Sequence, residues 1–323
     1  MEGILKGNIT ILSQAVTLVE SSKYEHQQVA QEIIEKCLPH AGKSVRIGIT
    51  GVPGAGKSTS IDAFGMHLIG EGRKLAVLAI DPSSERSKGS ILGDKTRMEA
   101  LSREKNAFIR PSPSAGSLGG VARKTRETIV LCEAAGFDTV FVETVGVGQS
   151  ETAVHSMVDF FLLIQLAGTG DELQGIKRGI MEMADGIIIN KADGDNLEKA
   201  KLAAAQFRNA LHLFPAPESG WFPKVLTYSG YYNLGIKEIW DMVGEYMEFT
   251  QKNGYFNYKR NEQAKYWMYE SINDTLRETF YHNPAVESML NLTEQQVLNN
   301  EISSFVAAKR MMDLFLENLS ASK

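Results

Sequence analysis

Several residue types that mark specialised classes of protein are scarce in this chain. Among 323 residues there are only 2 cysteines, Cys37 and Cys132, and their spacing fits neither a disulfide framework nor a zinc site. The formal net charge is −5, so no global basic field favours binding to nucleic acid. Disulfide-stapled, zinc-ribbon and strongly basic nucleic-acid-binding classes are therefore disfavoured.

Long hydrophobic runs and a targeting segment are also missing. The longest apolar stretches, such as Phe160–Leu166, are far too short to cross a bilayer. The first six residues lack the basic-then-apolar order of a signal peptide. Hydrophobic residues make up 43% and charged residues 23%, as in ordinary globular proteins. We therefore expect a cytoplasmic protein in a reducing setting, with no membrane partner.

A complete phosphate-binding loop is present near residue 50. The segment has the form GxxxxGK[ST] and lies between an apolar run, 45–50, and a predicted helix, 58–69. In such loops glycines let successive backbone N–H groups point at the phosphates, and the following helix directs its positive end at the same anion. Lys57 is predicted to reach the β- and γ-phosphates, and Ser58 to hold Mg²⁺. The loop residues predicted to contact the nucleotide are Gly51, Pro53, Gly54, Ala55, Gly56, Lys57 and Ser58.

A second motif indicates which nucleotide is bound. Asn190, Lys191 and Asp193 form an NKxD tetrad directly after a buried-strand pattern at 185–189. An aspartate here can accept two hydrogen bonds from guanine N1–H and its 2-amino group, which adenine cannot supply in that geometry. Alone, the tetrad also fits a polar turn after a strand. Following a phosphate-binding loop, it predicts a GTP-binding protein.

The chain divides into three predicted zones. Residues 1–43 are helical in pattern, and residues 44–248 alternate short apolar runs with amphipathic stretches. This alternation predicts a mostly parallel sheet covered by helices on both faces, a P-loop α/β fold that binds ligands at the carboxyl ends of its strands. Seven strands are predicted, at 46–50, 75–80, 107–109, 139–142, 160–166, 186–189 and 224–227.

The third zone, 249–323, is predicted to be helical without strands. Asn283-Pro284 has the form of a helix cap followed by proline at the first helical position. The segment Thr293-Glu294-Gln295-Gln296 has a capping-box pattern, which predicts another helix start. Helices of this zone either cover the nucleotide domain or pair with a second copy. The length of the extension favours a homodimer contact.

Three acidic residues lie where strands or loops open onto the predicted site. Asp81 closes the second predicted strand, Asp94 lies on a glycine-containing loop, and Glu143 closes the fourth strand. Glu143 is the first residue of the motif Glu-Thr-Val-Gly, which occupies the place of the usual DxxG motif. The glycine of that motif, here Gly146, is expected to contact the γ-phosphate. Each acid alone also fits a cap or turn residue. After a phosphate-binding loop, they predict the shell of Mg²⁺ and its waters.

The predicted site has no obvious group to orient the attacking water. Val147 follows Gly146 where many small GTPases have glutamine, and Gln149 is two residues farther on. Intrinsic hydrolysis is therefore expected to be slow, with an arginine or a partner stabilising the transition state. Arg97, on the loop of Asp94, is the local candidate, although its spacing equally fits a surface arginine.

Together these sequence motifs resemble those of one family, the methylmalonyl-CoA mutase-associated GTPases (the MeaB, ArgK and MMAA group). The resemblance covers essentially the whole chain, and ETVGVGQSE, at 143–151, is far more specific than a phosphate-binding loop. The other matching words lie at 48–59, 81–84, 89–98, 118–122, 170–177 and 190–193. Lys88 departs from the family pattern, which usually has glycine there, but touches no predicted ligand.

The resemblance implies properties beyond the residue-level reasoning. Such proteins have a SIMIBI-type P-loop fold, form homodimers through C-terminal helices, and bind an adenosylcobalamin-dependent acyl-CoA mutase. They use GTP binding and hydrolysis to gate cofactor loading and protect the mutase. By position, Thr59 joins Lys57 and Ser58 at the phosphates and Mg²⁺, and Asp81, Asp94 and Glu143 form the metal and water shell. The family's third switch corresponds to 168–177, where the residues implied to relay nucleotide state are Asp171, Glu172, Gln174 and Lys177.

Three other readings stay open at this level. A metal-insertion GTPase would need a histidine-rich terminus or a Cys-His pair near the site, whereas the 6 histidines are scattered. A small-molecule kinase would need an acceptor pocket and a base, a role that Glu143 can fill, but with GTP as donor. A third alternative is a protein that binds GTP and signals by its conformation with negligible GTP turnover. The presence of Val147 in place of a water-orienting glutamine is consistent with it. No DxHxxG cobalamin signature is present, so tight cobalamin binding is not expected.

Overall fold

The computed structural model describes residues 1–81, 98–113, 118–144, 150–167 and 178–321. They divide into two compact units, Met1–Ala264 and Lys265–Lys323. The boundary falls inside one long helix, and the predicted division at 43 and 248 stays a prediction. None of the described helices is both long and apolar enough to cross a membrane.

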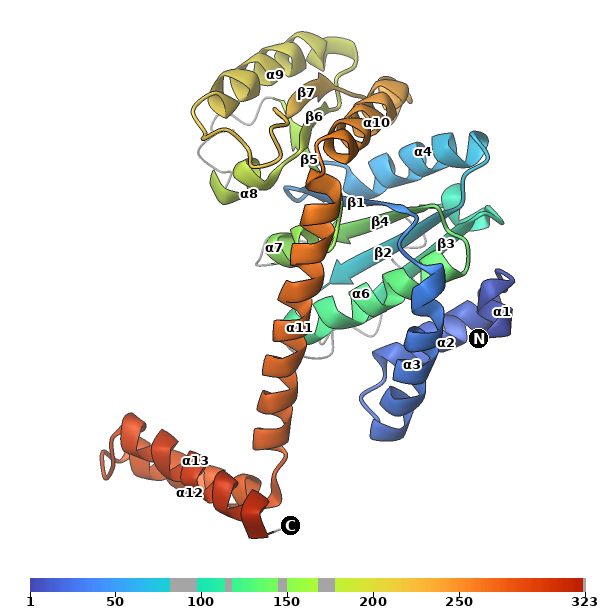
Figure 1. Cartoon of the computed structure of the whole chain (residues 1–323). Helices are drawn as coiled ribbons and strands as arrows, with labels where there is room; N and C mark the ends of the chain where they lie inside the picture. Colours follow the sequence, from blue (N-terminus) through green and yellow to red (C-terminus); the bar gives the residue numbers. More distant parts are fainter. Residues whose placement is uncertain (82–97, 114–117, 145–149, 168–177, 322–323) are drawn as a thin grey trace. The chain divides into compact units, whose positions relative to one another are not determined.

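The first unit is built on a parallel sheet of seven strands (Figure 1). Their order across the sheet is β3-β2-β4-β1-β5-β6-β7, so β1 is central and its neighbours β4 and β5 flank it. All seven predicted strands and the α/β fold class are confirmed. The strands are β1 Val45–Gly51, β2 Leu75–Asp81, β3 Ala107–Pro113, β4 Thr139–Thr144, β5 Phe160–Leu166, β6 Gly186–Asn190 and β7 Lys224–Thr227.

Helices cover both faces of this sheet, as continuous apolar strands require (Figure 1). On one face α4 and α10 pack against β1, β4 and β5, and bury Phe64, Phe141 and Tyr246 among others. On the other face α6, α7 and α9 contact the strands, and the N-terminal helices α2 and α3 pack on α6. The helices of this unit are α1 Glu2–Leu5, α2 Ile9–Glu20, α3 Tyr24–Cys37, α4 Lys57–Gly70, α6 Leu118–Ala134, α7 Ser150–His155, α8 Arg178–Met183, α9 Leu197–Leu211, α10 Ile236–Lys252 and the first part of α11 Tyr255–Tyr281.

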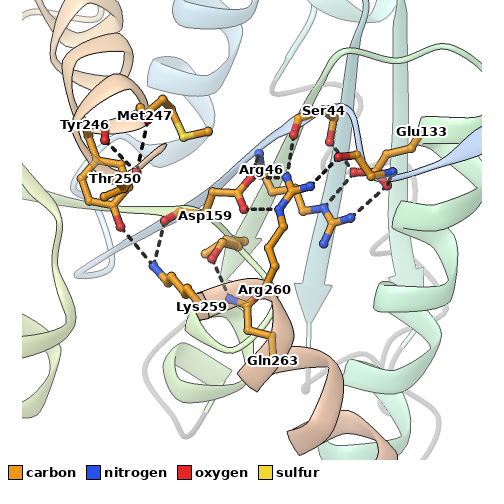
Figure 2. Close-up of polar contacts among 12 residues, drawn as sticks. Ser44, Arg46, Glu133, Asp159, Tyr246, Met247, Thr250, Lys259, Arg260 and Gln263 are labelled. Carbon is orange, nitrogen blue, oxygen red and sulfur yellow. Dashed lines mark hydrogen bonds and ion pairs between the residues drawn. The ribbon is translucent and has the colours of Figure 1, made fainter. Parts of the chain in front are cut away.

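Charged side chains fasten the amino-terminal edge of the sheet (Figure 2). Arg46 on β1 forms two hydrogen bonds, of 2.8 and 2.9 Å, with the carboxylate of Glu133 on α6. Ser44 and the Gly42 N–H also donate to this carboxylate. Burial by itself would raise the pKa of Glu133, but these donors hold it below its ordinary value.

The start of α11 is attached to the same edge (Figure 2). Arg260 donates to both carboxylate oxygens of Asp159, at 2.8 and 2.7 Å, and to the Ser44 carbonyl at 2.7 Å. One turn later, the Gln263 side chain donates to the Val158 carbonyl at 2.8 Å. The first turns of α11 are thus bound to the segment that joins α7 to β5.

The second unit contains the rest of α11 with α12 (Pro284–Leu298) and α13 (Ser304–Ala321). The predicted cap is confirmed, because the Asn283 side chain accepts from the N–H groups of Ala285 and Val286 and Pro284 begins α12. The capping box at Thr293 was wrong: Thr293 lies inside α12 and its hydroxyl donates to the Met289 carbonyl at 2.9 Å. Burial of this face of α12 against Met311 of α13 outweighs the local tendency to start a helix.

The Glu133→Gln substitution tests the ion pair at the sheet edge. It removes the carboxylate that is hydrogen-bonded to the buried Arg46 guanidinium, so we expect the free energy of unfolding in urea to fall by about 3 kcal/mol at pH 7. Because the folded-state pKa of Glu133 is lowered, the wild-type advantage should be present above pH 4.5 and disappear as the pH falls through that lowered pKa.

Glu99→Gln provides the matched control for this experiment. Glu99 pairs with Arg103 in an exposed i,i+4 arrangement, with both side chains more than 70% exposed. Its removal should lower the free energy of unfolding by less than about 1 kcal/mol. Equal losses for the two variants would contradict a special role for the buried pair.

Candidate functional site

The predicted phosphate-binding loop joins the central strand to α4. It leaves β1 at Gly51 and enters α4 at Lys57. Gly54 and Gly56 have φ angles of 80° and 85°, in the left-handed region that glycine adopts without strain. At Gly51, a Cβ atom would lie 2.3 Å from the carbonyl oxygen of Ile164 on β5, so only glycine fits. The strand–loop–helix context predicted from the sequence is confirmed.

Lys57 lies folded over this loop. Its ammonium group donates to the carbonyl oxygens of Gly51 at 2.8 Å and Val52 at 3.3 Å. Burial lowers the pKa of Lys57, and the negative charges of Glu143 and Glu151 partly offset that shift. The cation is therefore held at the mouth of the loop, where an anionic ligand would further favour its charged form.

Two of the acidic residues predicted for the metal shell lie on β4, which neighbours β1, and on β2, the next strand along the sheet. Glu143 is in β4 and is 4% exposed, and Asp81 is the last residue of β2. The hydroxyl of Thr144 donates to that of Thr50 at 2.9 Å, which ties the end of β4 to the end of β1. The carboxyl ends of β2, β4 and β1 thus converge at the edge that carries the phosphate-binding loop. The structure describes the backbone of Asp81 and not its side chain.

The oxygen donors at this edge suit Mg²⁺. Ser58 lies in the first turn of α4, and its hydroxyl and the Glu143 carboxylate are hard oxygen ligands of the kind Mg²⁺ prefers. Within the described ranges, no group of three or more histidine, cysteine, aspartate or glutamate side chains is arranged to hold a metal ion. Mg²⁺ usually takes one or two protein ligands together with substrate phosphates, so the donor set fits this ion.

Asn190, the first residue of the NKxD tetrad, joins three segments of the site. Its side-chain amide donates to the carbonyl of Ala55 in the phosphate-binding loop at 2.7 Å. Its oxygen accepts from the N–H groups of Lys191 at 2.7 Å and Gly230 at 3.2 Å. A Cβ atom on Gly56 would lie 2.6 Å from the amide nitrogen of Asn190, so only glycine fits at position 56 beside this amide.

Asp193 is positioned by the loop that follows β7. Ser229 donates a hydrogen bond from its hydroxyl to the Asp193 carboxylate. The Ala192 N–H donates to the Tyr228 carbonyl at 2.9 Å, and Lys191 takes a positive φ of 57°. The tetrad and residues 228–230 therefore form one structural element.

Ser229 and Gly230 are site residues that the sequence analysis missed. Only the neighbouring positions of β6 and β7 bring residues 228–230 to the tetrad. A sequence signal did exist, because Ser-Gly follows the predicted strand at 224–227 and so falls at the same sheet edge as the other motifs. It was too short to interpret alone.

The structure places part of the predicted site. Lys57, Ser58, Glu143, Asn190, Lys191 and Asp193 lie on one edge of the sheet, with Pro53 and Thr59 on the loop and first turn beside them. The other predicted residues lie outside the described residues: Asp94, Arg97, Gly146, Asp171, Glu172, Gln174 and Lys177.

Replacing Asn190 by alanine tests its joining role. The change removes the Ala55 and Gly230 contacts, so we expect the affinity for a fluorescent guanosine diphosphate to fall by at least about tenfold, since each lost buried hydrogen bond costs about 1–3 kcal/mol. Asn209→Ala, on the exposed face of α9, is the control and should bind as the wild type does. Undiminished affinity in Asn190→Ala would show that this amide does not organise the nucleotide site.

Comparison with known proteins agrees with this geometry. The family model described as methylmalonyl Co-A mutase-associated GTPase MeaB matches residues 12–285. A solved structure described as LAO/AO transport system kinase superposes with a TM-score of 0.76 at 38% identity, covering 98% of this chain and 96% of that one.

Curated relatives carry related names. A putative GTPase of Caulobacter vibrioides is 50% identical over 312 residues, covering 97% of this chain and 95% of the relative. The GTPase ArgK of Escherichia coli is 44% identical, covering 95% and 93%. The methylmalonic aciduria type A homolog of Mus musculus is 45% identical, covering 97% and 78%. The resemblance seen in the sequence is thereby confirmed, and the chain belongs to the methylmalonyl-CoA mutase-associated family of P-loop GTPases.

Proposed function

We propose that this GTPase gates cofactor loading into an adenosylcobalamin-dependent acyl-CoA mutase and protects that mutase from inactivation. The observation that carries the proposal is the family match over residues 12–285, whose description names methylmalonyl-CoA mutase. The mouse relative, named for methylmalonic aciduria, supports the same partner class. The two cysteines of the present chain are both free and buried, which suits a reducing compartment such as the cytoplasm.

Residue roles follow from the positions on the sheet edge. Lys57 holds the β- and γ-phosphates, and Ser58, Asp81 and Glu143 hold Mg²⁺ and its waters. When bound, Mg²⁺ neutralises charge that develops on the phosphate oxygens. Asp94 and Arg97 are proposed to complete the metal shell and to stabilise the transition state. The convergence of β1, β2 and β4 at the phosphate-binding loop supports the roles given to Lys57, Asp81 and Glu143.

Guanine selection is assigned to Asp193, with Ser229 as its positioning residue. The hydrogen bond from Ser229 fixes one carboxylate oxygen, which orients the other toward a bound base. Guanine presents two adjacent donors to such a carboxylate, whereas adenine would leave it unpaired. Asn190 holds the tetrad against the phosphate-binding loop and also accepts from the Lys191 N–H, so base recognition and phosphate binding share one support.

Gating of a partner requires that the two nucleotide states differ in affinity for it. A coupling free energy of about 1–3 kcal/mol is typical, and the partner must then alter nucleotide affinity by the same factor. We assign the relay to the segment 168–177, through Asp171, Glu172, Gln174 and Lys177. Its position between β5 and α8 supports this assignment, because β5 neighbours the central strand that carries the phosphate-binding loop.

The second unit is proposed to form a homodimer contact. Many of its large apolar side chains are exposed, including Phe305 at 86% and Leu276 at 61%. Its own core is small and consists of Val286, Met311 and Phe315 with Phe280 and Leu290 packed against it. Apolar side chains exposed in this number are typical of association surfaces.

The Asp193→Asn substitution tests guanine recognition without a partner. It replaces one of two acceptors by a donor, so we expect GTP affinity to fall by about 100-fold or more. Xanthosine triphosphate has a carbonyl acceptor in place of the 2-amino donor, and the variant should prefer it. Competition against a fluorescent guanine nucleotide measures both effects. A variant that keeps its preference for GTP would contradict the assigned role.

Partner dependence is tested by turnover. Purified protein should hydrolyse GTP slowly and ATP negligibly, and an adenosylcobalamin-dependent acyl-CoA mutase should raise the GTP rate severalfold. Phosphate release is measured with and without mutase, with Lys57→Ala as the inactive control. A GTP rate that is indifferent to every such mutase would remove the partner assignment, whereas a preference for ATP would remove the guanine assignment.

A further inference from the structure

A cavity of about 260 Å³ opens on the amino-terminal edge of the sheet. His155, at the end of α7, and Asp185, which directly precedes β6, line it together with Lys259 of α11. The phosphate-binding loop follows the carboxyl end of β1, so this α7–α8 cavity lies on the opposite edge from the nucleotide site. It is therefore separate from the site described above.

The wall of the α7–α8 cavity is apolar. Met181, Leu211 and Phe214 line it, together with three prolines of the segment between α9 and β7: Pro215, Pro217 and Pro223. Phe222, another lining residue, is 60% exposed. An aromatic side chain left this exposed beside a cavity is typical of a contact surface.

The polar groups at the floor of the cavity compensate one another. The Lys259 ammonium donates to the Asp159 carbonyl at 2.7 Å and lies 3.5 Å from the Asp185 carboxylate (Figure 2 shows Lys259 and Asp159). Asp185 also accepts from the Phe161 N–H at 2.9 Å. Burial, assisted by the charge of Lys259, lowers the pKa of His155 to about 3, so its ring is neutral at physiological pH. Burial raises the pKa of Asp185, and the nearby charge of Lys259 partly offsets that shift. The floor therefore pairs one buried carboxyl group with one ammonium group.

Negative charge remains on the rim of the cavity. Glu182 and Glu218 line it, and both are exposed. Across the described parts of the chain Glu182 has no ion-pair partner, and Glu218 accepts only a hydrogen bond from the Tyr258 hydroxyl, at 3.1 Å. Arg178, one turn before Glu182 on α8, stacks over Phe214 at 5.5 Å. Among the described residues, Arg178 forms no ion pair with either carboxylate, so both carboxylates at the rim are left to pair with an incoming cation.

Size and charge together define the chemistry of an occupant. Pockets for whole small-molecule ligands usually measure about 300–1,000 Å³, so this cavity suits a single long side chain. An apolar wall below a negative rim fits a cation on an apolar stem. The aromatic rings of Phe222 and Tyr255 favour arginine over lysine, because a guanidinium stacks on aromatic faces.

The cavity also touches both helices that follow the predicted switch segments. α7 starts at Ser150, directly after residues 145–149, and ends in the cavity at His155. α8 starts at Arg178, directly after residues 168–177, and its residues 181–183 line the cavity. An occupant therefore contacts the far ends of two short helices whose near ends adjoin the nucleotide-sensing loops.

We propose that the α7–α8 cavity is a docking site for an arginine side chain of the acyl-CoA mutase partner. Docking there acts on α7 and α8 together and so couples partner binding to nucleotide state. Reciprocal coupling of this kind typically changes affinity by about 5- to 150-fold. The inference rests on the proposed function, which supplies the partner, while the cavity supplies the place and the chemistry of contact.

The first experiment tests the chemistry of the cavity without a partner. Full-length protein with labelled histidine is titrated with acetyl-argininamide, and the NMR signals of His155, assigned with a His155→Gln variant, are followed. We expect saturable shifts with a Kd of about 1 mM, the range for a ligand of this size. Acetyl-glutaminamide, which is uncharged, should cause none. Glu182→Gln/Glu218→Gln should weaken the arginine response at least about fivefold, and Glu25→Gln on α3 should leave it unchanged.

The second experiment tests the source of the arginine. Binding of the mutase to the GTP-loaded protein is measured by calorimetry for the wild type, the double variant and Glu25→Gln. We expect the double variant alone to lose about tenfold in affinity and much of its salt dependence, with basal GTP hydrolysis unchanged.

The outcomes separate the two proposals. Equal mutase binding by all three proteins overturns the docking site and leaves the proposed function intact. Absence of mutase binding by the wild type overturns the proposed function and the docking assignment together, and the acetyl-argininamide titration then decides whether the cavity has the assigned chemistry. A lack of saturable shifts, or equal shifts with acetyl-glutaminamide, rejects that chemistry directly.

Discussion

The side-chain amide of Asn190 is the interaction on which the organisation of the nucleotide site depends. It holds the phosphate-binding loop through Ala55 and the loop after β7 through Gly230, from a position at the end of β6. These segments are far apart in the sequence, and a parallel sheet brings them to one edge because all its strands end there. The buried amide has no water to replace a lost partner, so its contacts fix the spacing between the phosphate and base subsites. That spacing also explains why Gly56 cannot carry a side chain.

The opposite edge of the sheet is held by charge. Arg46 with Glu133, and Arg260 with Asp159, form two buried ion pairs that attach α6 and the start of α11 to β1 and the entry to β5. Desolvation offsets much of the attraction in such a pair, but loss of one partner is strongly destabilising because it leaves the other charge buried. Here they set where α11 leaves the sheet, next to α7 and the α7–α8 cavity. The two edges thus differ: one carries the phosphate-binding loop, and the other fixes α6 and the start of α11 to the sheet.

Much of the fold was predictable because local and global preferences agree. Most of the predicted strands are nearly continuous apolar runs, and such runs are typical of a sheet that is covered on both faces. The phosphate-binding loop and the NKxD tetrad were predictable because their backbone chemistry is local. Thr293 shows the limit of this reasoning: its capping-box pattern is real, but packing of α12 on α13 buries it inside a helix. Ser229 and Gly230 show a second limit, since their role exists only through contact with Asn190 and Asp193.

The sequence by itself determined the strands, the nucleotide class and the family, because these depend on short words and on periodicity along the chain. Tertiary structure alone decided which loop supports Asp193, how Asn190 links the two subsites, and that the helices after both predicted switch segments line one cavity. Those features are contacts between residues 36 to 135 positions apart, for example Asp193 with Ser229 and Asn190 with Ala55. No local pattern encodes such a pairing, because it depends on the strand order of the finished sheet.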